Sequence, residues 1–147
     1  MIIKSLEQLH SLSKKIADQL EKKDCIYLIG EIGVGKTTFA RYLINYLQTK
    51  KALKVTDVLS PTFNLLYEYD LKKYKIMHYD LYRIKEEKEL EQLGLFQDDQ
   101  NTIKIIEWPN LIKTPISDKL EIYMNYAKNE NEREVRFVGT GKWQYFK

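Results

Sequence analysis

Residues 30–37 read Gly-Glu-Ile-Gly-Val-Gly-Lys-Thr and match G-x-x-x-x-G-K-[ST], the pattern of a phosphate-binding P-loop. Glycines permit backbone angles and close approaches that a Cβ would obstruct, so the loop's N–H groups can surround phosphates. Lys36 would place a point charge at the outer phosphates, and Thr37 would offer a hydroxyl to Mg²⁺. The predicted nucleotide-binding residues of this segment are Gly30, Glu31, Ile32, Gly33, Val34, Gly35, Lys36, Thr37 and Thr38.

A P-loop needs a strand before it and a helix after it, and the flanking residues predict both. Residues 25–29 form a short apolar run that ends at Gly30, which indicates a strand. Residues 37–47 have apolar side chains at helical spacing, and the start of such a helix offers unpaired N–H groups and the positive end of its dipole. We therefore expect the nucleotide at the carboxyl end of strand 25–29.

Phosphate chemistry of this kind also needs a carboxylate near the metal, usually after a hydrophobic strand. Asp80 follows residues 76–79 and Glu107 follows residues 103–106. Either one alone would be an ordinary charge at a strand end, but with a P-loop present at least one should face the metal. The chain has neither an Asn-Lys-x-Asp segment for guanine nor an Asp-x-x-Gly segment after a strand, so ATP is the expected nucleotide.

The rest of the chain alternates between helical and strand patterns, which predicts an α/β fold: a sheet of the P-loop NTPase type flanked by helices. The 147 residues suit one small domain over 1–147. For 139–147 two alternatives stay open: a mobile tail, or a segment that packs Trp143 and Phe146 against the body. The predicted helices are 5–23, 37–47 and 86–93, and the predicted strands are 25–29, 64–69, 74–82, 102–106, 120–126 and 134–138.

Composition excludes several classes of protein. Lys plus Arg (24) exceed Asp plus Glu (21) by only three charges, too small an excess to indicate nucleic-acid binding by itself. The single cysteine, Cys25, lies in an apolar run, which favours a buried, inert thiol. No stretch approaches the roughly 20 apolar residues of a membrane span. We therefore expect a cytoplasmic protein that does not bind membranes.

Three further segments extend the pattern beyond the P-loop. They are Ser60-Pro61-Thr62-Phe63, His78-Tyr79-Asp80-Leu81-Tyr82-Arg83 and Glu107-Trp108-Pro109. Together with the P-loop, these segments give a pattern that resembles the TsaE (YjeE) family of bacterial P-loop ATPases. The resemblance covers most of the chain, from about residue 5 to 125. The P-loop alone identifies only the superfamily, whereas the three additional segments together are specific to this family.

The resemblance implies a function in making N6-threonylcarbamoyladenosine (t6A) in certain tRNAs. Such proteins bind the TsaD–TsaB heterodimer and hydrolyse ATP with Mg²⁺, weakly when alone. TsaD transfers the threonylcarbamoyl group, so any contact with tRNA is expected to be indirect.

The resemblance also assigns roles to residues of this chain. Lys36, Asp80 and Glu107 would be the catalytic residues, and Thr37 and Glu107 would hold Mg²⁺. Trp108 would lie beside the nucleotide, although a core aromatic is the alternative interpretation. Thr62 would lie in a switch-like segment that senses the γ-phosphate. Arg83 would pair either with a phosphate or with a neighbouring carboxylate.

Two other functions stay open from the residues themselves. A small-molecule kinase would share the P-loop, but such enzymes usually carry a lid with several arginines. This chain has only Arg41, Arg83, Arg133 and Arg136. A nucleotide-gated binding module with negligible turnover is the other alternative, and single-turnover hydrolysis distinguishes it from an ATPase.

Overall fold

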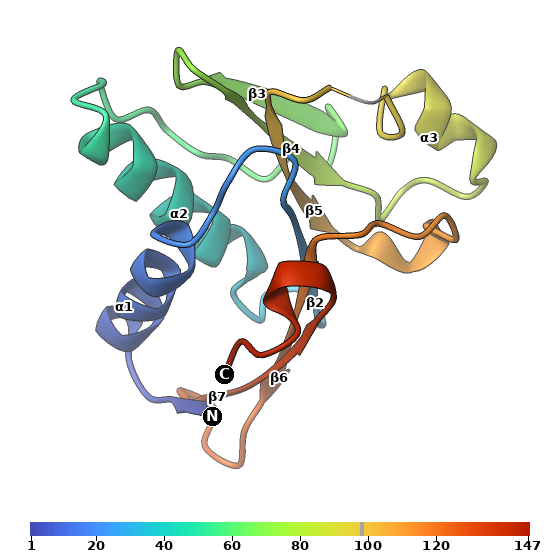
Figure 1. The fold of residues 1–147 in the computed structure, drawn as a ribbon. Coiled ribbons are helices and arrows are strands. Elements are labelled where there is room, and N and C mark those ends of the chain that lie inside the picture. Colours follow the sequence, from blue (N-terminus) through green and yellow to red (C-terminus); the bar gives the residue numbers. More distant parts are fainter. Residues whose placement is uncertain (98) are drawn as a thin grey trace.

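A seven-stranded mixed sheet forms the centre of the computed structural model, which describes residues 1–97 and 99–147 (Figure 1). The strand order is β1-β7-β6-β2-β5-β4-β3. β2 runs parallel to β5 and β6, and β4 runs parallel to β5, whereas β3, β7 and β1 are antiparallel to their neighbours. The strands are β1 (Ile2–Ile3), β2 (Cys25–Ile29), β3 (Leu66–Asp70), β4 (Lys75–Asp80), β5 (Thr102–Glu107), β6 (Lys119–Tyr126) and β7 (Arg133–Gly139).

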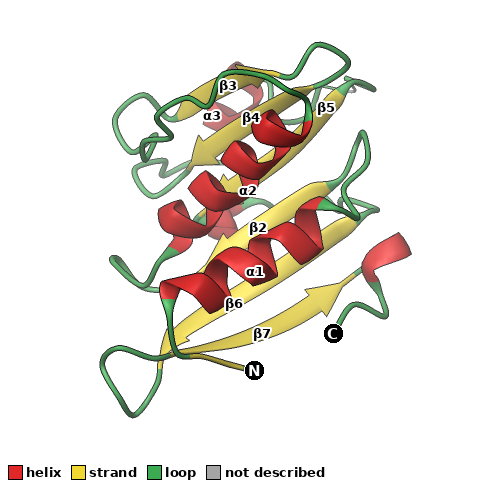
Figure 2. Ribbon diagram, turned by 90° about the vertical axis from the view of Figure 1, so that its left-hand side faces the viewer, coloured by secondary structure: helices red, strands yellow, loops and turns green. Residues whose placement is uncertain are grey.

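Helices cover both faces of this sheet unequally. α1 (Leu6–Ala17) and α2 (Lys36–Lys50) lie side by side over one face, and the short α3 (Lys88–Gln92) lies over the opposite face near β4 (Figure 2). Two single turns of 3₁₀ helix, η1 (Pro109–Leu111) and η2 (Gly141–Trp143), complete the regular structure. The arrangement confirms the predicted α/β fold.

The alternation of side chains along the strands divides the core into two clusters. On β2, Ile26 and Leu28 join the cluster under α1 and α2, whereas Cys25 and Tyr27 join the smaller cluster under α3. Every side chain in 25–28 is buried, as expected for a strand covered on both faces. The central position of β2 fixes the start of the P-loop at the middle of the sheet edge.

The helix predicted over 5–23 is shorter than expected. Ser5 caps its start by accepting a hydrogen bond from the Gln8 N–H (3.2 Å), but the helix ends at Ala17. The Asp18 carboxylate accepts from Tyr46 Oη (2.8 Å) and Lys50 Nζ (2.7 Å) on α2, and the chain then turns toward β2. Apolar spacing continues to Leu20, which packs on the core from the turn, so the pattern alone did not mark the helix end.

The last residues of the chain pack against the sheet, so the second of the two alternatives for 139–147 describes the structure. The Trp143 side chain is 2% exposed and lies edge-on to Phe146, whose ring also contacts Phe137 of β7. Among the described residues, no helix is both long enough and apolar enough to cross a membrane.

Candidate functional site

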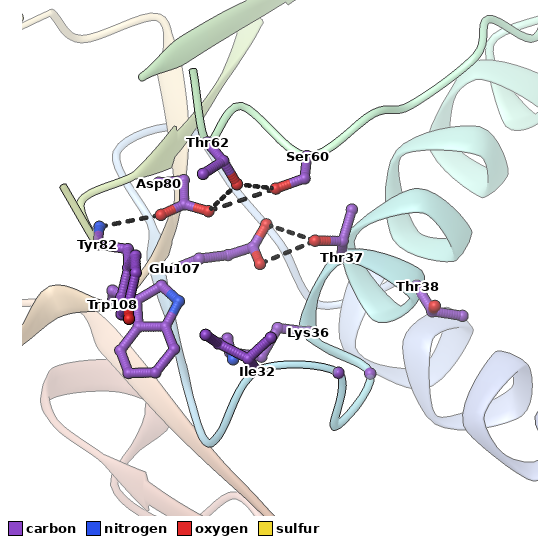
Figure 3. Close-up of a pocket in the computed structure, with 12 residues that line it drawn as sticks. Ile32, Lys36, Thr37, Thr38, Ser60, Thr62, Asp80, Tyr82, Glu107 and Trp108 are labelled. Atoms are coloured by element: carbon purple, nitrogen blue, oxygen red, sulfur yellow. Dashed lines mark hydrogen bonds between the residues drawn. The ribbon is translucent and has the colours of Figure 1, made fainter. Parts of the chain in front are cut away.

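A cavity of about 280 Å³ opens at the carboxyl ends of β2, β4 and β5, where α2 begins (Figure 3). Ten of the residues predicted for the site line this cavity. Gly30, Glu31, Val34 and Arg83 do not line it. The full lining is Ile32, Gly33, Gly35, Lys36, Thr37, Thr38, Ser60, Thr62, Asp80, Tyr82, Glu107 and Trp108.

Glycine is favoured at each of the three loop positions, but for different structural reasons. Gly33 (φ 79°) and Gly35 (φ 122°) adopt left-handed backbone angles that side chains disfavour. A Cβ on Gly30 would instead lie 2.3 Å from the Met124 carbonyl oxygen of β6. Among the hydrogen bonds of 1–97 and 99–147, none uses the N–H of Gly33 or Gly35, and no side chain caps α2. The loop therefore presents donors at a helix N-terminus, which suits an anion.

Lys36 is folded back onto its own loop. Its Nζ donates to the carbonyl oxygens of Gly30 (2.6 Å) and Glu31 (2.8 Å) and lies 4.4 Å from the centroid of the Trp108 ring. The side chain is 5% exposed. Burial lowers the pKa of the Lys36 ammonium, and the carboxylates of Glu107 and Asp80 act in the opposite direction. The positive charge is thus held beside the cavity by groups that a phosphate would outcompete.

Glu107 joins the P-loop helix to the sheet. Thr37 Oγ1 donates to its carboxylate oxygens at 2.9 and 3.1 Å, and His78 Nε2 lies 2.7 Å from Oε2. Glu107 and His78 are both buried. His78 Nδ1 has no hydrogen-bond partner among the described residues, so Glu107 is the polar contact of this buried ring. The carboxylate is therefore fixed from two sides, with the P-loop threonine as one of its partners.

Asp80 lies beside Glu107 in the sheet but has different partners. The two residues are directly paired in the β4–β5 register. Asp80 Oδ2 accepts from Thr62 Oγ1 (3.0 Å) and Ser60 Oγ (3.3 Å), and Oδ1 accepts from the Tyr82 N–H (2.9 Å) (Figure 3). Asp80 therefore ties the loop that contains Thr62 to the cavity, while Glu107 faces the P-loop.

Trp108 lines the cavity, so of its two predicted positions, beside the nucleotide site or in the core, the structure has the first. Its ring packs against the Tyr82 ring at 4.8 Å between centroids, and its backbone is left-handed (φ 59°, ψ 59°). Among the residues that the structure describes, no carboxylate forms an ion pair with Arg83, which was one of its two predicted partners. Its guanidinium lies 5.4 Å from the centroid of the Phe63 ring, because the chain turns after β4 and directs it toward the 60–63 segment.

Sequence reasoning missed three residues at the site: Ser60, His78 and Tyr82. His78 precedes Asp80 by two positions on a strand, so alternation places both side chains on one face, and this signal was present. Ser60 and Tyr82 belong to two of the family-specific segments, but their residue types alone indicate no role at the site. Their contacts depend on how the 60–63 segment folds over β4, which no periodic pattern reports.

Comparison with known proteins agrees with this geometry. Residues 3–135 match the sequence model of the family described as "Threonylcarbamoyl adenosine biosynthesis protein TsaE". The chain is 36% identical over 136 residues to the tRNA threonylcarbamoyladenosine biosynthesis protein TsaE of Aquifex aeolicus, covering 92% of each chain. It is 35% identical over 133 residues to the Rickettsia conorii protein, covering 90% of this chain and 73% of that one.

A solved structure supports the fold. The crystal structure of Bacillus subtilis YdiB superposes with a TM-score of 0.72 over 96% of this chain and 84% of that chain, at 24% sequence identity. The family match extends from β1 into β7 and includes the whole cavity lining. On these grounds the chain belongs to the TsaE family of tRNA threonylcarbamoyladenosine biosynthesis proteins.

Proposed function

We propose that this chain is a Mg²⁺-dependent ATPase that acts with the TsaD–TsaB heterodimer in t6A formation. One observation carries the ATPase part of the proposal. The P-loop lysine, the P-loop threonine and a buried carboxylate meet at one cavity, with Thr37 Oγ1 2.9 Å from Glu107 Oε1. A lysine, a hydroxyl and a carboxylate around exposed loop N–H groups are the parts that phosphoryl transfer uses.

The chain's own residues would bind and orient the triphosphate. The N–H groups of Gly33 and Gly35, with the start of α2, would face the phosphate oxygens. Lys36 would leave the carbonyl oxygens of Gly30 and Glu31 and donate to the outer phosphates instead. Trp108 and Tyr82, whose rings pack together at the cavity, would limit the access of water on that side.

The oxygen donors present fit a magnesium ion. Mg²⁺ prefers oxygen ligands and is usually held by one or two protein groups together with phosphates and waters. Thr37 Oγ1 and the Glu107 carboxylate supply such donors at the mouth of the P-loop. When bound, Mg²⁺ would neutralise charge that develops on the phosphates. Glu107 therefore is the preferred metal-holding carboxylate, and Asp80 orients the 60–63 loop.

The family assignment supports a function in t6A biosynthesis, and the shape of the site supports a partner. Two exposed apolar side chains lie at or beside the cavity lining: Ile32 is 67% exposed, and Phe63, next to the lining residue Thr62, is 82% exposed. A lone domain leaves its phosphate site partly open to water, which weakens electrostatic stabilisation of the transition state. Docking of TsaD–TsaB over this rim would exclude that water.

Reconstitution tests the proposal. Purified chain, TsaD–TsaB, substrate tRNA and the small substrates would be combined, and t6A would be measured by nucleoside mass spectrometry beside release of phosphate from ATP. We expect slow ATP hydrolysis by the chain alone, faster hydrolysis with the heterodimer, and t6A formation that requires the chain. Single-turnover hydrolysis separates this function from a nucleotide-gated binding module.

The Lys36→Ala variant serves as the inactive control. Lys50→Ala is the matched control, a lysine removed from the same helix that should leave activity unchanged. Lys50 lies at the other end of α2 and pairs with Asp18, away from the cavity. If the wild-type chain neither binds ATP nor supports t6A formation, the proposed function is wrong. If it transfers phosphate to a small acceptor rather than to water, the kinase alternative replaces it.

A further inference from the structure

The outer side of the P-loop, away from the cavity, is in contact with β6 and β7. Gly30 packs on the Met124 carbonyl, and a Cβ on Gly35 would lie 3.3 Å from Met124 Cε. At the end of the strands, Arg133 Nε donates to the Val34 carbonyl oxygen (2.8 Å), and Tyr126 Oη donates to the Ile32 carbonyl oxygen (3.3 Å). The phosphate-binding loop is therefore contacted by residues some 90 to 100 positions later in the sequence.

Arg133 is itself held in place. It is the direct cross-strand partner of Tyr126, and its guanidinium lies 4.3 Å from the centroid of that ring. Its Nη1 donates to the Glu130 and Glu132 carbonyl oxygens at 2.6 and 2.9 Å. Its backbone pairs with Ile3 of β1. These contacts leave the Nε–H directed at Val34.

The direction of the loop carbonyls matters for phosphate binding. The loop binds anions because its N–H groups point inward, and a carbonyl that turned inward would bring negative charge toward the phosphates. Lys36 holds the Gly30 and Glu31 carbonyls in this structure, and under the proposed function it would release them when it turns to the phosphates. The donors to the Val34 and Ile32 carbonyls, Arg133 and Tyr126, are separate from Lys36, so movement of Lys36 would not by itself remove them.

We propose that Arg133, assisted by Tyr126, is a positioning residue that holds the P-loop carbonyls outward and so maintains the loop in its phosphate-binding form. The identity of the ligand rests on the proposed function, whereas the support of the loop rests on the geometry alone. Arg133 does not line the nucleotide cavity and is not a catalytic residue.

The same hairpin contains a matched control. Arg136 and Tyr123 are also direct cross-strand partners, with the guanidinium 4.1 Å from the ring centroid. Because residues 133 and 136 are three apart on a strand, their side chains lie on opposite faces of the sheet. Arg136 and Tyr123 thus reproduce the arginine–tyrosine stack on the face away from the P-loop.

The experiment compares Arg133→Gln and Tyr126→Phe with Arg136→Gln and Tyr123→Phe in the full chain. Two quantities are measured: the Kd for MgATP by calorimetry, and amide hydrogen exchange of the peptide covering 30–37 without nucleotide. Loss of a charge-assisted hydrogen bond predicts about a tenfold weaker Kd for Arg133→Gln, and loss of a neutral one about threefold for Tyr126→Phe. Both variants should also exchange the loop amides faster. The Arg136 and Tyr123 variants should stay within about twofold of wild type.

Thermal melting separates support of the loop from stability of the hairpin. Equal losses of Tm and of ATP affinity in Arg133→Gln and Arg136→Gln would show that the stacks only stabilise the hairpin, and would overturn the proposal. Unchanged loop exchange in Arg133→Gln would do the same. If Arg133→Gln does not fold, Tyr126→Phe decides by the same exchange measurement. If the wild-type chain does not bind ATP, the proposed function fails, yet loop exchange still tests the role of Arg133.

Discussion

Lys36 is the residue on which nucleotide affinity should depend most. Its ammonium is the only cation lining the cavity in the described residues, and it is already desolvated. We expect Lys36→Ala to weaken MgATP binding at least about tenfold, since one charge-assisted contact contributes roughly 1.5–3 kcal/mol. Calorimetric titration measures this, with Lys50→Ala as the control at the far end of α2. Unchanged affinity in Lys36→Ala would contradict the P-loop assignment.

The two carboxylates should affect turnover more than binding. Glu107→Gln keeps an oxygen acceptor for Thr37 but removes the charge that a metal requires, and Asp80→Asn loosens the hold on Ser60 and Thr62. We expect the single-turnover rate to fall about tenfold or more in each variant, while the Kd for ATP changes less than about threefold.

Glu121→Gln is the control for this comparison, because Glu121 is a strand carboxylate paired with Lys119 and remote from the cavity. Full activity of both the Glu107 and the Asp80 variants in the assembled complex would show that the metal assignment is wrong. A defect in binding rather than in rate would indicate that the carboxylates position the loop and not the reaction.

Among the elements, β2 offers a direct probe of whether the sheet opens. Cys25 is 1% exposed, and burial raises the pKa of its thiol to about 12. The raised value keeps the thiol protonated at pH 8, whereas an exposed cysteine has a pKa of roughly 8.5 and is partly ionised there. We expect iodoacetamide to leave the native chain unmodified and to add one adduct in denaturant, as measured by intact mass. Rapid modification of the native chain would show that β2 is accessible.

The individual elements were largely predictable, because the residues that form them carry strong local patterns. The strand at 25–29 and the two hairpins appear where alternation and turn residues predicted them, within a few residues at each end. The end of α1 was not predictable, since the contacts of Asp18 with Tyr46 and Lys50 come from another helix.

The site residues also divide into those that the sequence could predict and those that it could not. Residues of the P-loop and the strand-end carboxylates were found because each follows a recognisable run. The partner of Glu107, His78, required the β4–β5 register, and the contact of Arg133 with Val34 required the position of β7 beside β6. Such contacts join segments far apart in the chain, and no local pattern in a single sequence reports them.

For the whole molecule, nucleotide and partner binding should be coupled. The 60–63 loop lines the cavity with Ser60 and Thr62 on one side and exposes Phe63 on the other, so under the proposed function both ligands would meet at the same element. Coupling between two sites is reciprocal. We expect ATP and ADP to give affinities for TsaD–TsaB that differ at least about fivefold, and the heterodimer to speed hydrolysis.

Titration of the heterodimer with nucleotide-free, ATP-bound and ADP-bound chain measures this coupling. Phe63→Ala is informative here, since it alters the exposed side of the loop and leaves the Thr62 hydroxyl in place. Absence of binding in every nucleotide state, with turnover also unchanged, would end the assignment of this partner but not the ATPase proposal.

The left-handed backbone of Trp108 has a consequence for how the site would tolerate change. A non-glycine residue at φ 59° costs about 1 kcal/mol relative to an ordinary conformation. Glycine would relieve that strain, yet it would remove the ring that packs on Tyr82 and lies over Lys36. The contacts of the Trp108 ring with Tyr82 and Lys36 therefore have to outweigh the strain of its backbone. We therefore expect Trp108→Gly to relax the backbone at position 108 while leaving the Lys36 ammonium without its aromatic cover at the cavity.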